Sequence, residues 1–260
     1  MRYLIILTFA FILFGGCSGE DSPHVDTTPP TRPVMIPHLG VPGDPDIFMN
    51  DAWVEITDDN NGIDTVPNGD HMRIMWEPFI DTDLSHLKVF RFSDINPEPI
   101  EIDQIQANQY SYLDQGPLVE RVWYSYFIEL FDASGNSTVS DTVSYALLAK
   151  PHLIEPQNGA VVDITNLEFQ WNRADDRTGF YRVLVWNQHR RLIWHQDLYL
   201  GLEDDPLTMS FPIIVDEENP IYPGDTLRWR VNYFDYDDLH QMNMGSKSEE
   251  RIFIVGPDNG

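Results

Sequence analysis

The chain has 260 residues, of which 42% are hydrophobic and 22% are charged. Its 42 acidic and 16 basic residues give a formal net charge of −26 at pH 7. Such a surface repels nucleic acid and anionic lipid headgroups, so we expect neither of them as a partner. The hydrophobic content is sufficient for a folded core. An acidic surface with few lysines is typical of proteins that are adapted to salt.

The first residues have the pattern of an export signal. Arg2 is followed by an apolar run at residues 3–14, which is shorter than the ~20 residues that a membrane-spanning helix needs. A basic start, a short apolar segment and small residues before a cleavage site are typical of a secretory signal peptide. The small pair Gly15-Gly16 stands directly before Cys17, the only cysteine of the chain. We therefore expect residues 1–16 to be a signal peptide.

The residues around Cys17 resemble the lipobox of bacterial lipoproteins, whose cysteine is lipidated and becomes the new N-terminus. The family prefers Leu three residues before the cysteine, where this chain has Phe14, with Leu13 one residue earlier. The resemblance implies that Cys17 is a lipid anchor. An ordinary signal peptide and an uncleaved anchor are the alternatives. Residues 17–28 are polar and lack periodicity, so we expect a flexible tether there.

The lipoprotein resemblance implies a bacterial cell envelope, with attachment to a membrane through the lipid. Ser18 is not the aspartate that retains some lipoproteins at the inner membrane, and Glu20-Asp21 resembles the surface-export signal of Bacteroidetes lipoproteins. We therefore expect an outer-membrane location, with exposure at the cell surface as an option. The sequence does not decide which leaflet of the membrane carries the lipid.

The acidic charge has an alternative interpretation, which is an acidic envelope protein without adaptation to salt.

Beyond Pro29, apolar residues alternate at period two in short runs that Pro, Gly, Asn and Asp interrupt, a pattern that predicts strands. The strands expected in the first half are 72–76, 86–92, 123–131 and 142–148. Those expected in the second half are 167–171, 181–187, 222–235 and 251–255. Short strands at this spacing predict β-sandwiches, and the remaining length suits two domains of ~110 residues each.

The first half resembles a fibronectin type III domain. PPTRP at 29–33 resembles the start of that domain, and WYSYFIELFDASGNST at 123–138 resembles its sixth strand and following turn. The resemblance implies that Trp76 is the core tryptophan and that Tyr124 is the tyrosine-corner residue. One departure is the unusually long, polar-rich stretch at residues 43–70 between the first two strands.

The second half repeats this plan more loosely, with Trp171 in the place of the core tryptophan and Leu227 in the place of the corner tyrosine. Lys150-Pro151 marks the expected boundary, because proline favours an extended chain before it. The expected fold class is all-β, with two tandem fibronectin type III-like or immunoglobulin-like sandwiches. The expected limits are 29–148 for the first domain, 149–256 for the second domain and 257–260 for a tail.

Strand alternation also predicts an aromatic outer face on the first domain. The strands at 86–92 and 123–131 are neighbours in the fold that the sequence resembles. Alternate residues on both strands would then share one outer face: Phe90, Phe92, Trp123, Phe127 and Phe131. Contiguous exposed apolar patches mark interfaces, so this face is the leading candidate for binding a partner protein. Cover by residues 43–70 or by the second domain is the alternative.

A smaller outer face is expected on the second domain. Leu184 and Trp186 would lie outward beside Arg228 and Arg230. Aromatic rings beside planar hydrogen-bonding groups can bind sugars, and they also form ordinary cation–π ladders on surfaces. Both interpretations stay open, and the first makes this face a candidate glycan-binding site.

One acidic loop raises the question of calcium. Asp58, Asn60 and Asp64 in DDNNGID could supply several hard oxygen ligands to one ion, although the spacing is not that of an EF-hand. An acidic turn without metal is the alternative, and no other cofactor is expected. The chain contains no G-x-S-x-G, H-E-x-x-H or glycine-rich phosphate loop.

The function that we expect is non-catalytic. The resemblance to fibronectin type III modules implies protein binding or scaffolding at the bacterial surface, with an envelope protein as the partner. Carbohydrate binding and a passive spacer role are the alternatives. The identity of the ligand and the oligomeric state do not follow from the sequence.

Overall fold

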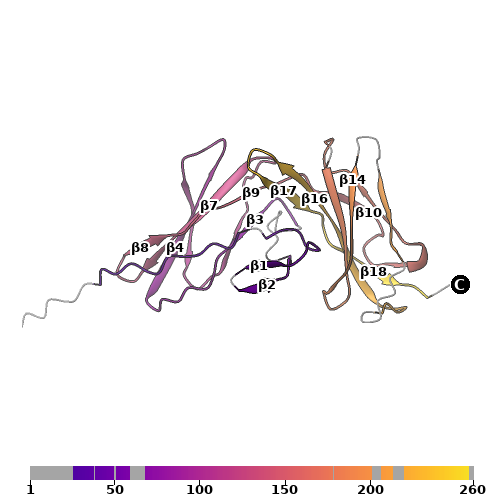
Figure 1. Ribbon diagram of the computed structural model, residues 1–260, viewed down its shortest axis with the longest axis horizontal. Helices are drawn as coiled ribbons and strands as arrows, with labels where there is room; N and C mark the ends of the chain where they lie inside the picture. Colours follow the sequence, from indigo (N-terminus) through magenta and orange to yellow (C-terminus); the bar gives the residue numbers. More distant parts are fainter. Residues whose placement is uncertain are drawn as a thin grey trace, which may run out of the picture.

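The computed structural model describes residues 26–37, 39–49, 51–58, 68–177, 179–200, 206–212 and 220–257. Two sandwiches of β-strands follow one another along the long axis (Figure 1). The signal peptide at 1–16 and Cys17 lie outside the described residues, so lipidation stays a prediction. In the part of the chain that the structure describes, no helix has both the length and the apolarity to cross a membrane.

The first sandwich packs a small sheet against a larger one. The small sheet pairs β3 (Met72–Met75) with β6 (Ser111–Asp114), and Met35 joins it through a bridge to Trp76. The larger sheet has the order β5–β4–β7, and β8 and β9 both pair with β7. Its strands are β4 (Leu84–Ser93), β5 (Ile100–Gln106), β7 (Trp123–Asp132), β8 (Ser137–Val139) and β9 (Val143–Ala146).

Alternation decides which side chains of the first sandwich form its core. The core includes Leu87 and Val89 of β4. From β7 it takes Tyr124, Tyr126, Ile128 and Leu130. Trp76 is fully buried, and its indole Nε1 donates a hydrogen bond to the carbonyl of Gln109 at 2.9 Å. The inward faces and the core tryptophan that the sequence predicts are therefore confirmed.

The tyrosine corner is also present. The hydroxyl of Tyr124 accepts a hydrogen bond from the backbone N–H of Val119 at 2.8 Å. This is the geometry expected of a tyrosine near the start of the sixth strand that fixes the chain a few residues upstream.

The second sandwich has the same plan with longer strands. One sheet has the order β10–β12–β15, and the other has the order β11–β18–β16–β13–β14, with β17 also on β16. The first sheet contains β10 (His152–Glu155), β12 (Glu168–Asn172) and β15 (Leu207–Ser210). The second contains β11 (Ala160–Val162), β13 (Gly179–Trp186), β14 (Leu192–Leu200), β16 (Thr226–Asp237), β17 (Met242–Lys247) and β18 (Arg251–Val255). A short 3₁₀ helix, η1, spans Ile164–Asn166.

The core of the second sandwich is rich in aromatic residues. Trp171, which takes the place of Trp76, is fully buried, and Leu227 fills the position of the corner tyrosine at 1% exposure. Tyr181 of β13 stacks on Tyr233 of β16 with 4.7 Å between ring centroids. The second core tryptophan that the sequence predicts is therefore confirmed.

The strand order makes each sandwich fibronectin type III-like. In the first sandwich, β3 pairs with the opening segment at Met35 and with β6, while β4, β5, β7 and β9 form the facing sheet. In the second, β12 pairs with β10 and β15, while β13, β14, β16 and β18 form the facing sheet. The all-β fold class with two tandem sandwiches is therefore confirmed. The boundary expected at Lys150-Pro151 falls between β9 and β10 and stays a prediction.

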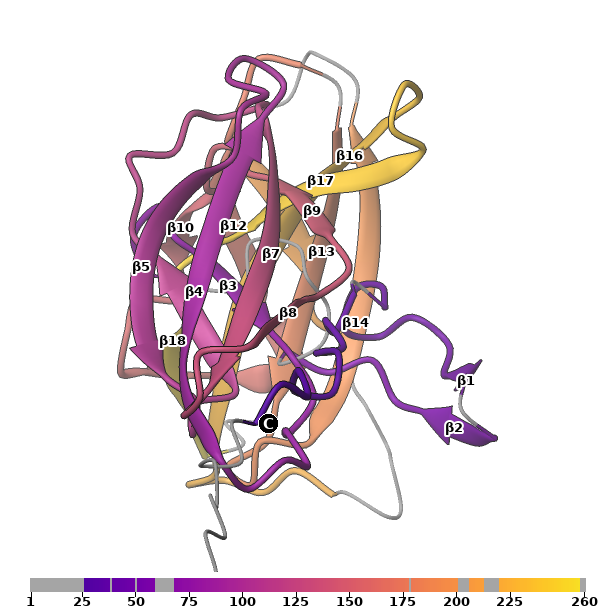
Figure 2. The same cartoon turned by 90° about the vertical axis from the view of Figure 1, so that its left-hand side faces the viewer.

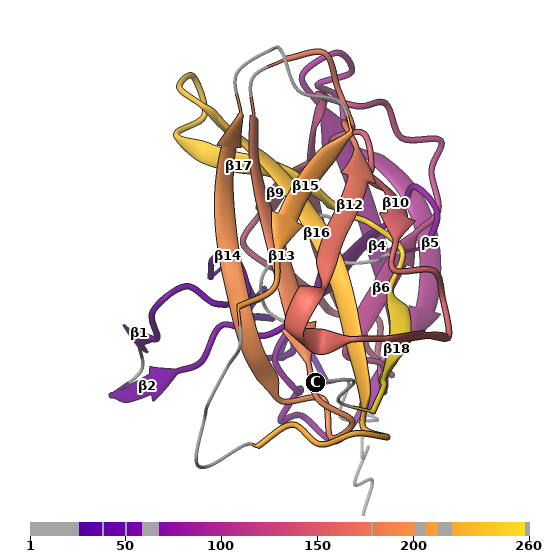
Figure 3. The ribbon, with the colours of Figure 1, turned by 90° about the vertical axis from the view of Figure 1, so that its right-hand side faces the viewer.

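The departure from the fibronectin pattern forms a strap. We define the strap as the described residues of 41–58, which include a hairpin of β1 (Ile47–Met49) and β2 (Ala52–Val54). Asp51 at the turn has φ = 61°, a conformation that tight hairpin turns require and that Asp tolerates better than most residues. The hairpin extends sideways beyond the sheets, as Figures 2 and 3 show from opposite ends.

Candidate functional site

The outer face of the first sandwich carries an aromatic surface, which we call the Phe face and define by Phe90, Phe92, Phe127 and Phe131. Phe90 lies opposite Phe127 across β4 and β7, and their rings stack with 4.8 Å between centroids. The ring of Phe92 lies 6.5 Å from that of Phe127. All four side chains are half-buried, so their outward orientation is confirmed and a binding role stays a prediction.

Trp123 does not belong to this face, because the alternative of cover by the second domain holds for its side chain. Its side chain points outward from β7 as alternation requires, but it is only 2% exposed because the second sandwich covers it. The indole Nε1 donates to Asp237 Oδ2 at 2.6 Å, and the indole ring stacks on the ring of His240 at 4.7 Å. Trp123 is therefore part of the joint between the sandwiches.

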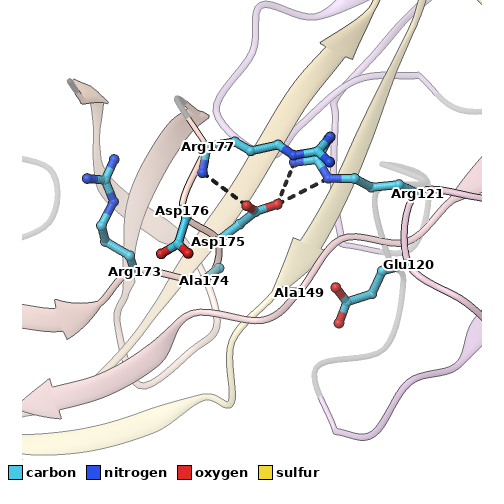
Figure 4. Close-up of a pocket in the computed structure, with 8 residues that line it drawn as sticks. All are labelled: Glu120, Arg121, Ala149, Arg173, Ala174, Asp175, Asp176 and Arg177. Atoms are coloured by element: carbon cyan, nitrogen blue, oxygen red, sulfur yellow. Dashed lines mark hydrogen bonds and ion pairs between the residues drawn. The ribbon is translucent and has the colours of Figure 1, made fainter. Parts of the chain in front are cut away.

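Arg121 is a second element of this joint. Its Nη2 donates to Asp175 Oδ2 at 2.7 Å and its Nη1 to Asp235 Oδ2 at 3.1 Å, and both carboxylates belong to the second sandwich. Burial opposes the charge of Arg121, but hydrogen bonds to Asp175 and Asp235 raise its pKa above the usual value. The contacts to Asp175 border an open cavity of about 510 Å³ (Figure 4).

The cavity at the joint mixes both signs of charge. Besides Arg121 and Asp175, it is lined by Glu120, Ala149, Arg173, Ala174, Asp176 and Arg177. The backbone N–H of Arg177 donates to Asp175 at 3.0 Å, so this carboxylate accepts hydrogen bonds from both sandwiches. Because its cations and carboxylates partly neutralise one another, we interpret the cavity as a polar seam of the joint.

Backbone contacts complete the joint. Leu147, which follows β9, forms a parallel bridge with Gly245 of β17, and the backbone N–H of Leu148 donates to the carbonyl of Gly245 at 3.1 Å. The hydroxyl of Ser246 donates to the carbonyl of Ala149 at 2.6 Å. Figure 1 shows β9 and β17 side by side at the centre of the molecule. Side chains and backbone together therefore join the sandwiches into one unit.

The strap lies on the outer face of the second sandwich. Asp44 accepts a hydrogen bond from Arg182 of β13 at 2.7 Å, and Asp58 pairs with both terminal nitrogens of Arg230 on β16. The side chain of Arg182 is 7% exposed and that of Arg230 is 1% exposed. Buried cations need such partners, because an unpaired charge in a dry environment is costly. The strap therefore neutralises and covers part of this sheet.

Because the strap covers this part of the sheet, the exposure that we expected for the candidate glycan face is wrong. Leu184 is fully buried, Trp186 is 8% exposed and Arg230 is 1% exposed, whereas Arg228 is half-buried and pairs with Glu250 at 3.0 Å. The guanidinium carbon of Arg230 lies 4.9 Å from the centroid of the Trp186 ring. Arg230 and Trp186 therefore form a cation–π pair, although a buried one and not a surface ladder, and among the described residues Leu184 and Trp186 present no open platform for sugars.

A cavity of about 530 Å³ nevertheless remains beside Trp186, between the strap and the turn after β13. Asp46 and Ile56 of the strap line one side, and His189 and Leu192 line the other. A sugar could contact the edge of an aromatic ring and several hydrogen-bonding groups in such a place.

Asp58, the first calcium ligand that the sequence suggests in DDNNGID, pairs with Arg230, and calcium binding stays a prediction. Burial alone would raise the pKa of Asp58, but the charge and the hydrogen bonds of Arg230 hold this pKa below its usual value. Asp58 thus acts as the partner of a buried arginine. Asn60 and Asp64 lie outside the described residues.

Another group of carboxylates converges in the first sandwich. Oxygen atoms of Asp26, Asp83 and Asp132 lie within 4.8 Å of one another, and oxygen is the ligand that calcium prefers. Asn136 already donates through Nδ2 to Asp132 at 2.8 Å and to the carbonyl of Asp26 at 3.1 Å. These hydrogen bonds make Asp132 and the backbone of Asp26 part of the turn at Asn136.

Two aromatic groups with exposed members were not predicted from the sequence. Phe48 and Trp53 stand on the β1–β2 hairpin at 60% and 71% exposure. Phe180 lies between Phe234 and the highly exposed Tyr199 on the second sandwich, with centroid distances of 4.1 and 4.5 Å. Short apolar triplets around Asn50-Asp51 were the signal that could have revealed the hairpin.

Comparison with known proteins supplies no family. No protein-family model matches the chain, and a search of curated proteins finds no similar sequence. Solved structures that match include the chicken CNTN1 FN1–FN3 domains, at 13% identity and a TM-score of 0.29, covering 88% of this chain and 67% of that chain. Fibronectin(III)-like modules of Clostridium thermocellum CbhA match at 14% identity and a TM-score of 0.26, covering 72% and 86% respectively. With TM-scores this low, the fold assignment rests on the strand order of the chain itself.

Proposed function

We propose that this protein is a non-catalytic lipoprotein of the bacterial cell envelope that binds or scaffolds another envelope protein. The anchor would be Cys17, and the location would be the outer membrane with the sandwiches lifted off it by residues 17–28. The observation that carries the proposal is the Phe face, where Phe90 stacks on Phe127 and Phe92 lies beside them, while the pair of Lys88 and Glu129 separates this group from Phe131. Partly exposed apolar surface of this kind is typical of protein interfaces.

The joint between the sandwiches supports a scaffolding role. Arg121 and Trp123 hold the two sandwiches together through charged hydrogen bonds, and the strap adds two ion pairs on the second sandwich. A unit joined in this way presents surfaces at a fixed spacing. Fibronectin type III-like folds commonly serve as binding or spacing modules, although a fold alone does not define a function.

The test is a crosslinking pull-down of the full lipoprotein from its native envelope, at low and high salt, followed by mass spectrometry. The variant is Phe90→Ala with Phe127→Ala, and the matched control is Val161→Ala with Tyr222→Ala, which removes two exposed apolar side chains elsewhere. Loss of one dominant protein partner in the first variant alone supports the proposal. Undiminished capture by a folded Phe90/Phe127 variant, judged by its circular dichroism and melting temperature, would contradict it.

Carbohydrate binding is the second candidate, and the cavity beside Trp186 is the observation that favours it. Envelope and plant glycans would be titrated while tryptophan fluorescence is recorded. A saturable change that is lost in both Trp186→Ala and His189→Ala would support this function. Because Trp186 is nearly buried, His189→Ala serves as the variant that leaves the core intact. Unchanged tryptophan fluorescence with every glycan would count against a sugar ligand. Absence of both a protein partner and a glycan partner would indicate a passive spacer.

A further inference from the structure

The β1–β2 hairpin is an apolar projection from an acidic protein. Its strands read IFM and AWV, so all six paired residues are apolar. Phe48 lies opposite Trp53, and their rings meet edge to face with 5.5 Å between centroids. These side chains are 60% and 71% exposed, in a chain with a net charge of −26. The pair forms an aromatic knob in contact with solvent.

The two ends of the hairpin are fixed although its tip is not covered. Val41 and Ile56 are buried at 1% and 4% exposure on either side of it. Asp44 before the hairpin and Asp58 after it pair with buried arginines of the second sandwich. A two-stranded hairpin is marginally stable in water by itself. Its anchored ends therefore hold the hairpin away from the sheets, in the position that Figures 2 and 3 show.

The charges around the aromatic knob indicate which kind of partner it attracts. Asp46 precedes β1 and Asp51 lies at the turn, and both carboxylates are exposed. Anionic lipid headgroups would be repelled by these carboxylates, and so would a second copy of the same acidic chain. A protein surface with lysine or arginine at the corresponding positions would instead be attracted.

We infer that the β1–β2 hairpin docks into an apolar cleft of a protein partner whose rim carries lysine or arginine. This inference rests on the proposed function and adds a contact surface separate from the Phe face. A projecting knob matches a concave surface better than a flat one. Tryptophan is enriched among the residues that dominate binding energy, because it buries a large rigid surface.

The test begins with a photocrosslinking residue placed at position 48, at position 90 or at position 222 of the full lipoprotein in its native envelope. Tyr222 is the control because it is 61% exposed and lies on the second sandwich. The expected result is a crosslink from position 48 to one protein, on a peptide that combines apolar residues with lysine or arginine. Crosslinks only to lipid, only to a second copy, only to a glycan or to no molecule would overturn the inference.

The partner identified in this way would then be purified and its affinity measured. Trp53→Ala should weaken binding at least about 30-fold, as expected for a dominant interface tryptophan. Leu239→Ala, which removes a side chain that is 85% exposed elsewhere, should change affinity less than about twofold. Asp46→Asn with Asp51→Asn should slow association and flatten its salt dependence. Equal affinities of the wild type and Trp53→Ala would overturn the inference.

The proposed function and this inference fail in different ways. A protein that crosslinks to position 90 but not to position 48 would remove the hairpin as a docking element and leave the Phe face in place. Absence of protein crosslinks from both positions would contradict both.

Discussion

The indole N–H of Trp123, at the start of β7, donates a hydrogen bond to the carboxylate of Asp237, at the end of β16, with 2.6 Å between Nε1 and Oδ2. Nδ1 of His240 lies 2.9 Å from the same oxygen, and Leu239 donates its backbone N–H to the other one. The carboxylate is thus held by groups from both sandwiches. The hydrogen bonds of Trp123 and then of His240 lower the pKa of Asp237 to about 2.

The joint should therefore weaken in acid. The pKa of Asp237 is lower in the folded protein than its ordinary value of 3.8, so folding favours the ionised form. Its contribution to stability is fully present above about pH 4 and is lost as the pH falls toward about 2. Asp237→Asn should accordingly lower the melting temperature at pH 7, and the difference from the wild type should shrink in acid.

Thermal unfolding between about pH 2 and pH 7 checks this prediction. Asp238→Asn is the matched control, because Asp238 is an exposed neighbour of Asp237. Its melting temperature should follow that of the wild type at every pH. A difference between Asp237→Asn and the wild type that stays constant across the range would contradict the assignment.

Replacing Arg121 should loosen the two sandwiches. Arg121→Ala removes the hydrogen bonds to Asp175 and Asp235, and we expect the free energy of unfolding to fall by about 2 kcal/mol. Arg121→Lys should lose less than this, since a lysine keeps the charge without the planar fork. Urea denaturation measures the loss, and small-angle X-ray scattering should show a larger radius of gyration for Arg121→Ala.

The control for this series is Arg177→Ala, in the same cavity. Arg177 reaches Asp175 through its backbone N–H, which the substitution retains. Its side chain is exposed, so stability should change by less than about 0.5 kcal/mol. An equal loss in Arg121→Ala and Arg177→Ala would indicate that the charge of the cavity, rather than the bridge across the joint, stabilises the protein.

The tyrosine corner gives a more local prediction. Tyr124→Phe keeps the ring but removes the hydroxyl that accepts from Val119 at 2.8 Å. We expect a loss of about 1 kcal/mol in the free energy of unfolding, the usual net value of one such hydrogen bond. Tyr110→Phe, at a side chain that is 53% exposed, is the control and should be neutral. If Tyr124→Phe is also neutral, the hydroxyl has no role in fixing the corner.

Alternation was sufficient to predict the inside of each sandwich but not what covers the outside. Ile128 and Val89 face the core because every second residue of a strand shares one face. The same rule correctly turns Trp123 and Trp186 outward. It says nothing about packing between sandwiches or about cover by a distant segment. Alternation therefore could not decide between exposure and cover for Trp123, and Trp186, which was expected to be exposed, is buried.

Edge strands were also missed, for a physical reason. In β5, IEIDQIQ leaves most side chains exposed, so apolar alternation is weak even though the strand pairs with β4 along its length except at a bulge beside Ile102. The contacts of the strap were missed for a different reason. Its apolar hairpin and its two carboxylates are visible in the sequence, but the arginines that pair with the carboxylates, Arg182 and Arg230, lie more than a hundred residues away. Such pairing follows from the fold and not from local spacing.

The strap itself yields the last prediction. Asp58→Asn removes the negative charge that faces Arg230, whose side chain is 1% exposed. Nζ of the buried Lys247 lies 3.9 Å from Asp58 Oδ1 and donates to the backbone carbonyl of Asp58 at 3.3 Å, so the substitution removes the first contact and leaves the second in place. Leaving one member of a buried ion pair without its partner costs about 3 kcal/mol or more. We therefore expect Asp58→Asn to lower the free energy of unfolding by about this amount.

A double variant separates the pair from the strap as a whole. Arg230→Met with Asp58→Asn removes both charges, so it should be more stable than Asp58→Asn alone, because no buried arginine is left uncompensated. Asp46→Asn, at an exposed carboxylate of the same strap, is the control and should be neutral in urea denaturation. Faster proteolysis within residues 41–58 in Asp58→Asn than in Asp46→Asn would show that the pair holds the strap on the sheet. Equal proteolysis rates would mean that Val41 and Ile56, both buried, hold it without the ion pair.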